Sequence, residues 1–200
     1  MYIKQEVSNT IVIEKSKFIT YMKRVKSEEE FKDYLNQIKK KHYDASHVCS
    51  GFICHNINRS SDDGEPSGTA GAPILNALVK NNLDEVCALV VRYFGGTKLG
   101  TGGLIRAYSS AVSECIKTGT LIENIEYPKY NLVLTYELAN KVEHYIKNNT
   151  ILLNTKYDEN ITFQFALDDK NKLETIKEYT KGIVPIYIGI ENIEQKEQEQ

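Results

Sequence analysis

Two short segments hold most of the residues that could do chemistry. We call them loop 1 (DDGEPSGTAG, residues 62–71) and loop 2 (RYFGGTKLGTGG, residues 92–103), and together they contain eight of the twelve glycines. Glycine permits positive φ angles and lets the backbone approach another molecule closely. Each loop lies between a predicted strand and a predicted helix, so unpaired N–H groups and the positive end of a helix dipole would point out of it. Such a loop suits a phosphate or a carboxylate.

Three cations in or after loop 2 would complete an anion site, and they are Arg92, Lys98 and Arg106. Neither loop matches a nucleotide fingerprint. GTGGLI has Ile105 where a dinucleotide-binding fold needs its third glycine, and GGTKLGTG lacks the GK[ST] ending of a P-loop. The alternative is that the glycines serve only tight turns and close packing of helix on sheet. The motifs therefore predict an anion site without identifying its ligand.

Loop 1 also carries three carboxylates in four residues, Asp62, Asp63 and Glu65. They are candidate ligands for a hard cation such as magnesium, although EF-hand spacing is missing. Carboxylates in turns more often accept hydrogen bonds from their own backbone, and we prefer that interpretation. Ser67 and Thr69 lie beside Glu65 as a conceivable nucleophile and base, but a hydrogen-bonding turn explains them more simply.

Two further groups have a chemical and a structural interpretation. His47, Cys49 and His55 share one face of a predicted strand and suggest a Cys/His nucleophile. Alternation with apolar residues favours buried side chains instead. Tyr93 and Phe94, beside loop 2, are the pair best placed to stack on a base, with core packing as the alternative.

The elements that must position these loops follow an α+β pattern. An apolar run over residues 84–94 predicts a central strand covered on both faces. A capping box predicts a helix that begins at Ser27. The long helix after loop 2 buries Leu104 and Tyr108 and exposes Arg106 on its opposite face. Further strands are predicted at residues 11–14, 17–25 and 47–55, a long polar loop at 56–71, and a short helix from Pro73.

The last third of the chain has its own order of elements. From Pro128 the pattern reads strand, helix, strand, strand, helix, strand, which is the βαββαβ order of a ferredoxin-like domain. The closing strand contains Pro185, which an edge strand tolerates. We therefore predict two domains, residues 1–127 and 128–193, followed by a polar tail at 194–200.

Composition excludes several classes of protein. A net charge of −2 argues against a generally basic protein that coats nucleic acid, and we expect no DNA specificity. No run approaches the roughly 20 apolar residues of a membrane helix, and the N-terminus does not resemble a secretory signal. The cysteines lack CxxC or zinc spacing, which indicates buried thiols in a reducing compartment. We expect a cytoplasmic protein without a cofactor. The four cysteines are Cys49, Cys54, Cys87 and Cys115.

The segments DDGEPSGTAGAPIL and VVRYFGGTKLGTGGLIRAYSSAV resemble the signature of the YigZ/IMPACT family. The resemblance implies a β-α-β first domain like those of GHMP kinases, ribonuclease PH and a small-subunit ribosomal protein. It implies a second domain similar to a C-terminal domain of elongation factor G. Eukaryotic IMPACT members regulate translation by competing for an activator of an initiation-factor kinase. Their N-terminal RWD domain is not found in this sequence, and the family motif supplies no catalytic residues.

We therefore expect a non-enzymatic regulator of translation that binds the ribosome, RNA or a translation-associated protein. One alternative is a metal-assisted enzyme acting on a phosphorylated small molecule, with Asp62, Asp63 and Glu65 around the metal. Another is a regulator that binds only proteins. The expected binding surface comprises Gly64, Glu65, Pro66, Ser67, Gly68 and Thr69 of loop 1, with Arg92, Tyr93, Gly95, Gly96, Lys98, Gly100, Gly102, Gly103 and Arg106.

Overall fold

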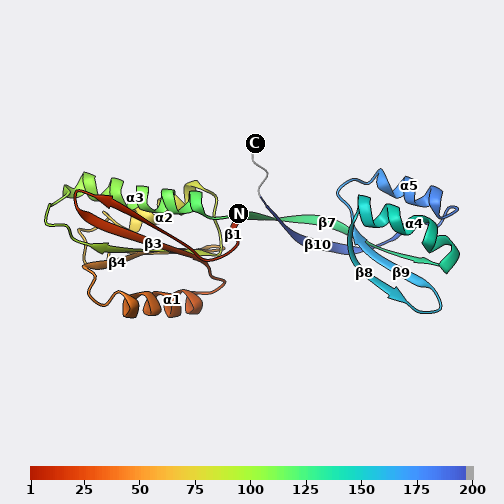
Figure 1. The fold of residues 1–200 in the computed structure, drawn as a ribbon, viewed down its shortest axis with the longest axis horizontal. Coiled ribbons are helices and arrows are strands. Elements are labelled where there is room, and N and C mark those ends of the chain that lie inside the picture. The colour runs from red at the N-terminus through yellow and green to blue at the C-terminus, as the bar shows by residue number, and fades with distance from the viewer. Residues whose placement is uncertain (197–200) are drawn as a thin grey trace. The chain divides into compact units, whose positions relative to one another are not determined.

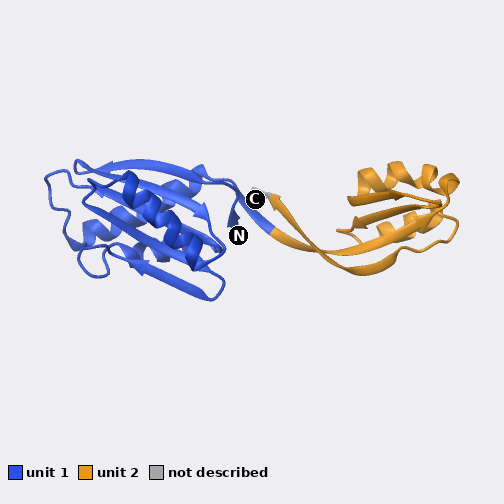
Figure 2. Ribbon diagram, turned by 90° about the horizontal axis from the view of Figure 1, so that it is seen from below, with its two compact units in different colours: residues 1–123, 196–200 blue, residues 124–195 orange. Residues whose placement is uncertain are grey.

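The structure is a computed structural model, and it describes residues 1–196. The chain forms two compact units, unit 1 from residues 1–123 and unit 2 from residues 124–195 (Figure 2). Strand β7 (Leu121–Leu134) runs from one unit into the other. The domain boundary expected after residue 127 lies within this strand, so no turn marks the division.

A five-stranded sheet forms the centre of unit 1 within the described residues (Figure 1). Helix α1 (Glu28–Lys41) covers one face, whereas α2 (Gly71–Lys80) and α3 (Gly100–Thr118) cover the other. The short strand β1 (Tyr2–Ile3) pairs instead with β7. Neighbouring strands of the central sheet are antiparallel and lie in the order β2 (Val7–Ile13), β3 (Ser16–Arg24), β6 (Val86–Tyr93), β4 (His47–Cys54) and β5 (Ile57–Ser61).

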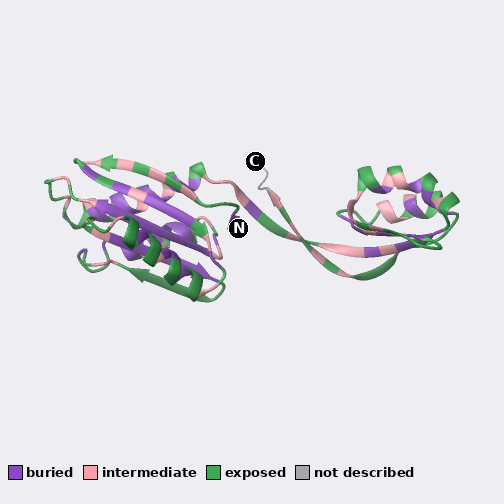
Figure 3. Ribbon diagram, turned by 60° about the horizontal axis from the view of Figure 1, so that its bottom comes forward, coloured by how far each residue is buried: buried purple, intermediate pink, exposed green. Residues whose placement is uncertain are grey.

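Strand β6 is the central, doubly covered strand that its apolar run predicted. It pairs with β3 on one side and β4 on the other, and every residue from Val86 to Arg92 is buried. Figure 3 shows long buried stretches in the strands of the unit 1 sheet. The side chains of β6 alternate between two hydrophobic clusters. Val86, Ala88 and Val90 pack with α2 and α3, and Cys87, Leu89 and Val91 pack with α1. Because of this alternation, Arg92 and Tyr93 at the end of the strand face opposite sides of the sheet.

One prediction for unit 1 is wrong. Residues 56–71 do not form a single long loop, because residues 57–61 form the edge strand β5. All five of its residues are exposed, so β5 lacks the apolar alternation that reveals a half-buried strand. His55 lies in the turn before β5 with a positive φ of 51°, outside the strand predicted for residues 47–55.

Unit 2 contains its elements in the predicted order. They are β7, α4 (Tyr136–Asn149), β8 (Ile151–Tyr157), β9 (Ile161–Ala166), α5 (Lys172–Tyr179) and β10 (Ile186–Lys196). Strand β7 pairs with β9 and β10, and β8 pairs with β9. The core lies between the sheet and the two helices, around Leu132, Val142 and Phe163. Among residues 1–196, no helix is both long and apolar enough to span a bilayer. The ferredoxin-like assignment stays a prediction. Residues 194–196, expected in a polar tail, belong to β10, and the rest of that tail lies outside the described residues. Pro185, expected within the closing strand, lies just before β10.

Candidate functional site

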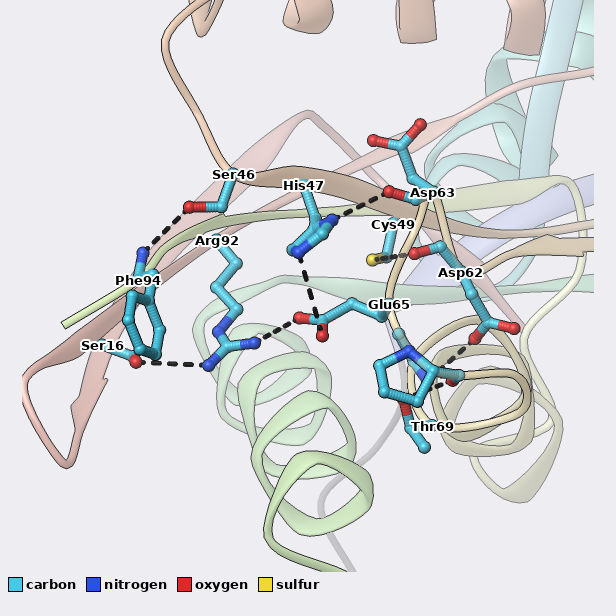
Figure 4. A network of polar contacts seen from close by, with 12 residues as sticks. Ser16, Ser46, His47, Cys49, Asp62, Asp63, Glu65, Thr69, Arg92 and Phe94 are labelled. Carbon is cyan, nitrogen blue, oxygen red and sulfur yellow. Dashed lines mark hydrogen bonds and ion pairs between the residues drawn. The ribbon is translucent and has the colours of Figure 1, made fainter. Parts of the chain in front are cut away.

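Loop 1 and loop 2 meet at one end of the central sheet of unit 1, as predicted (Figure 4). Loop 1 follows β5 and leads into α2, and loop 2 follows β6 and leads into α3. A short ion pair joins them, with 2.6 Å between Arg92 Nη1 and Glu65 Oε1. Only 6% of the Arg92 side chain and 3% of the Glu65 side chain are exposed. Buried charges of this kind persist only when they are paired.

Glu65 is the centre of a buried polar network. Its Oε1 also accepts a hydrogen bond of 2.7 Å from the hydroxyl of Tyr108, on α3. Its Oε2 lies 3.9 Å from Nε2 of His47, on β4. Burial, reinforced by Cys49 and Glu65, raises the pKa of Tyr108, so its hydroxyl remains a donor. One carboxylate thus ties loop 1 to both the sheet and α3.

This network changes the role expected for Arg92. Its charge is balanced inside the protein by Glu65, so Arg92 positions the two loops and does not supply net positive charge to an external anion. Its Nη2 also contacts Ser16 Oγ at 3.4 Å, and the same oxygen accepts a hydrogen bond of 3.1 Å from Gly95 N–H. Glu65 thus pairs with Arg92 and not with Arg106.

The Asp62 carboxylate organises the rest of loop 1. It accepts hydrogen bonds from the backbone N–H groups of Gly68 (2.8 Å), Ala70 (3.0 Å) and Gly71 (2.8 Å), where α2 begins. Partial burial alone would raise the pKa of Asp62, but these three donors outweigh it and lower the pKa. The turn interpretation of this carboxylate is therefore correct.

Asp63 is bound equally firmly to other parts of unit 1. Its carboxylate accepts 2.7 Å and 2.6 Å hydrogen bonds from Val48 N–H and Lys39 Nζ. Asp62, Asp63 and Glu65 therefore point to separate partners. Within residues 1–196, no three His, Cys, Asp or Glu side chains are grouped to hold a metal ion. The geometry that the magnesium hypothesis needs is not formed by these carboxylates.

The proposed Cys/His pair does not form either. Cys49 Sγ donates to the Asp62 carbonyl at 3.0 Å and lies 3.3 Å from the Tyr108 hydroxyl. Burial raises the pKa of the Cys49 thiol to about 12, which keeps it protonated and weakly nucleophilic at neutral pH. Nδ1 of His47 is hydrogen-bonded to the Asp63 carbonyl at 2.9 Å. The Thr69 hydroxyl is also used within the protein, because it donates a hydrogen bond of 2.6 Å to the Pro66 carbonyl in a turn.

Two pockets open beside this network. The first, which we call the loop pocket, has a volume of about 340 Å³ and includes Glu65, Pro66, Arg92, Phe94 and Leu104 in its walls. The second, the helix pocket, has a volume of about 450 Å³. Its walls include Glu14, Lys98, Arg106 and Ser110. Lys98 and Leu99 line both pockets, so the two adjoin at loop 2.

The exposed cations of these pockets, unlike the buried residues around Glu65, have no partner within the described part of the chain. Lys98 and Arg106 are exposed and form no ion pair or hydrogen bond with any residue in the described part of the chain. Helix α3 begins next to Lys98 without a side-chain cap and with no acidic residue in its first turn. Phe94 is 50% exposed in the wall of the loop pocket. Positive charge and an aromatic ring are thus presented together.

Tyr93 faces the other side of the sheet from this site. It packs against the cluster beneath α1, and its hydroxyl contacts His42 Nδ1 (2.9 Å) and Asp44 (3.1 Å). Its proposed place on the binding surface therefore needs correction, because neighbouring residues of a strand point to opposite faces. The other predicted residues exposed or half-exposed in the two loops are Gly64, Pro66, Ser67, Gly68, Gly95, Gly96, Gly100, Gly102 and Gly103.

A steric constraint explains why position 95 is a glycine. A Cβ atom at this position would lie 2.0 Å from the carbonyl carbon of Lys15, in the turn between β2 and β3. Loop 2 therefore passes directly over that turn. Sequence reasoning missed this contact and the role of Ser16, because the two segments are almost 80 residues apart. No local pattern indicates such a contact.

The Impact N-terminal domain family matches residues 14–116, which include both loops and the whole buried network. The chain belongs to the IMPACT family. This confirms the resemblance found in the sequence. The IMPACT family member YvyE of Bacillus subtilis (strain 168) is 39% identical over 187 residues, which cover 90% of this chain and 86% of the relative.

Another relative is the IMPACT family member YigZ of Escherichia coli (strain K12), 33% identical over 161 residues, or 78% of this chain and 79% of YigZ. A crystal structure described as that of a hypothetical protein aligns with a TM-score of 0.60 and 28% identity. It covers 95% of this chain and 96% of that one. The likeness to IMPACT family proteins therefore extends beyond the matched domain to most of the chain.

Proposed function

We propose that this IMPACT family protein is a cytoplasmic regulator of translation that acts by binding and not by catalysis. Its binding surface is the end of unit 1 where loop 1 and loop 2 meet. Its partner is the ribosome, RNA or a ribosome-associated protein, and no metal or cofactor is required. Family membership supports the regulatory role.

One observation carries the proposal: the carboxylates of the site are used internally, and two of its three cations are not. Glu65, Asp62 and Asp63 each accept short hydrogen bonds from the protein itself. Lys98 and Arg106 have no such partner in the described chain, and they lie beside the uncapped start of α3. This distribution favours an anion-binding surface over a hydrolytic centre, because catalysis needs an available base or nucleophile.

The fold that we propose for each unit is compatible with this role. Unit 1 is assigned to the type found in GHMP kinases, ribonuclease PH and a small-subunit ribosomal protein. Unit 2 is assigned to the ferredoxin-like type seen in a C-terminal domain of elongation factor G. The strand order β10-β7-β9-β8, with α4 and α5 in the connections, supports the second assignment.

Co-sedimentation with purified ribosomes at increasing salt concentration tests the function. Binding should weaken steeply as salt rises, because contacts to phosphate release counterions. The double variant Lys98→Ala/Arg106→Ala should bind more weakly, with a salt slope shallower by about two. The matched control, Lys32→Ala/Lys117→Ala, removes two cations that form surface pairs with Glu28 and Glu114, and should bind like the wild type.

A wild-type protein that does not sediment with ribosomes at low salt would contradict the proposal. So would equal losses in the two double variants, because the loss would then reflect net charge and not the site. Treating the ribosomes with ribonuclease separates an RNA contact from a protein contact. Retention of binding after digestion would favour a protein partner.

A further inference from the structure

The loop pocket and the helix pocket have complementary chemistry. The loop pocket has apolar walls from Pro66, Phe94 and Leu104, with the polar edges of Glu65 and Arg92 beside them. The helix pocket is lined by the cations Lys98 and Arg106 and by the hydroxyl of Ser110. Lys98 and Leu99 line both pockets, so the two are neighbours. A ligand that reached into both would need a flat, largely apolar part joined to an anionic part.

The loop pocket favours an aromatic ring with polar edges. The Phe94 ring is half exposed, and the Arg92 guanidinium lies 5.6 Å from its centroid. One polar atom of the pocket residues also has unused hydrogen-bonding capacity. Among the described residues, Glu65 Oε2 has only His47 Nε2 near it, at 3.9 Å. A ring with an N–H donor on its edge, as nucleobases have, suits such an acceptor.

The helix pocket favours a phosphate. Lys98 and Arg106 line this pocket and supply two positive charges that have no partner among the described residues. Glu14 also lines this pocket and opposes them. Two cations against one carboxylate leave a net attraction for an anion, which a neutral residue at position 14 would strengthen.

We propose that the two pockets together bind one nucleotide, with its base in the loop pocket and its phosphate in the helix pocket. The nucleotide comes either from a free mononucleotide or from the phosphorylated end of an RNA. This inference rests on the proposed function insofar as RNA is one of the partner classes named there. It adds the chemical unit that is recognised and the residues that recognise each part.

Competition binding with the full-length protein tests the inference. The probe is a short single-stranded RNA with a 5′-phosphate and a fluorescent label at its 3′ end, followed by anisotropy. The competitors are nucleoside 5′-monophosphates, the matching nucleosides, ribose 5-phosphate and inorganic phosphate. A nucleoside monophosphate should compete at least about tenfold better than any competitor that lacks the base or the phosphate.

Variants assign the two parts of the ligand. Phe94→Leu should weaken binding of the monophosphate about tenfold but leave ribose 5-phosphate unaffected, because only stacking is lost. Arg106→Ala should weaken the monophosphate about tenfold but leave the nucleoside unaffected. Glu14→Gln should tighten the monophosphate by about two- to fivefold, which no disruption of the fold would produce. The controls are Tyr43→Leu, at another exposed ring, and Lys117→Ala, at the far end of α3.

The source of the nucleotide follows from the same titrations. Binding of the 5′-phosphorylated RNA about tenfold or more tighter than the monophosphate assigns an RNA end, and equal binding assigns a free nucleotide. The inference is overturned if neither binds at millimolar concentration, or if ribose 5-phosphate competes as well as the monophosphate. Weaker binding by Glu14→Gln would also overturn the assignment of the helix pocket.

Failure of the inference differs from failure of the proposed function. Ribosome binding that depends on Lys98 and Arg106, without any nucleotide binding, would overturn the inference and leave the function standing. Nucleotide binding with the predicted variant effects, but without ribosome binding, would support the inference and contradict the proposed function.

Discussion

Removal of the Glu65 carboxylate should destabilise unit 1 strongly. In Glu65→Ala, Arg92 keeps its charge in a site where its side chain is only 6% exposed, and it loses its ion-pair partner. Breaking a buried ion pair from one side costs about 3–5 kcal/mol. The Tyr108 hydroxyl loses its 2.7 Å acceptor in the same change. We expect a loss of about 3–5 kcal/mol in the free energy of unfolding of unit 1, or about 10–15 °C in its melting temperature.

The assay is hydrogen exchange measured by mass spectrometry, because it reports on each unit separately. Peptides from β6 should lose protection in Glu65→Ala, whereas peptides from β9 in unit 2 provide an internal reference. Glu114→Ala is the matched control. Its carboxylate is 47% exposed and pairs with Lys117 on the surface, so its loss should cost less than about 1 kcal/mol.

A second variant identifies the cause of the loss. Glu65→Leu leaves Arg92 unpaired, whereas Glu65→Leu/Arg92→Met replaces both charges with apolar side chains. The double variant should be the more stable of the two, because a buried charge without a partner costs more than the loss of the pair. A double variant less stable than Glu65→Leu would refute this reasoning. So would a loss below about 1 kcal/mol in Glu65→Ala.

Three further predictions concern the same network. The pKa of Asp62 is lowered in the folded protein. The stability that Asp62 adds relative to Asp62→Asn should therefore be constant above about pH 5 and should disappear as the pH falls below about 4. Urea unfolding of both proteins at several pH values can measure this difference. The Cys49 thiol, with its pKa raised to about 12 by burial, should resist iodoacetamide at about pH 8 until urea unfolds the chain; labelling of the folded protein at the rate of a free thiol would contradict its burial. Gly95→Ala should lower the free energy of unfolding by at least about 2 kcal/mol, because its Cβ would lie 2.0 Å from the Lys15 carbonyl carbon. Gly102→Ala should be tolerated, because the nearest atom to its Cβ would be a side-chain nitrogen at 3.6 Å.

The order of elements could be predicted wherever apolar residues repeat over several turns or strand positions. The continuous run of β6 and the stripe of α3 with Leu104, Tyr108 and Ala111 are both buried as expected. The edge strand β5 could not be predicted, because all five of its residues are exposed and its sequence INRSS carries no apolar pattern. Burial creates the periodicity on which such predictions depend.

The different roles of the cations could be predicted only in part. Arg92 and Arg106 were both expected to bind an anion, because nothing near Arg92 in the sequence identifies Glu65 as its internal partner. The register of β6 explains this partner. Val86, Ala88 and Val90 face α2 and α3, so Arg92 continues that series beneath the helices and meets Glu65. Tyr93 points the other way for the same reason.

In the proposed binding surface, the two loops would contribute differently. In loop 1, Asp62, Asp63 and Glu65 fix the backbone through short hydrogen bonds, so this half is already ordered before a partner arrives. In loop 2, Thr97 and Lys98 make no hydrogen bond with other described residues. A segment that is ordered before binding avoids the entropic cost of being ordered on association. In the proposed function, loop 1 would therefore set the shape that a partner must match, and the exposed Lys98 would supply positive charge. A chain with a net charge of −2 can bind an anionic partner in this way, because the two cations Lys98 and Arg106 outnumber Glu14 in the helix pocket.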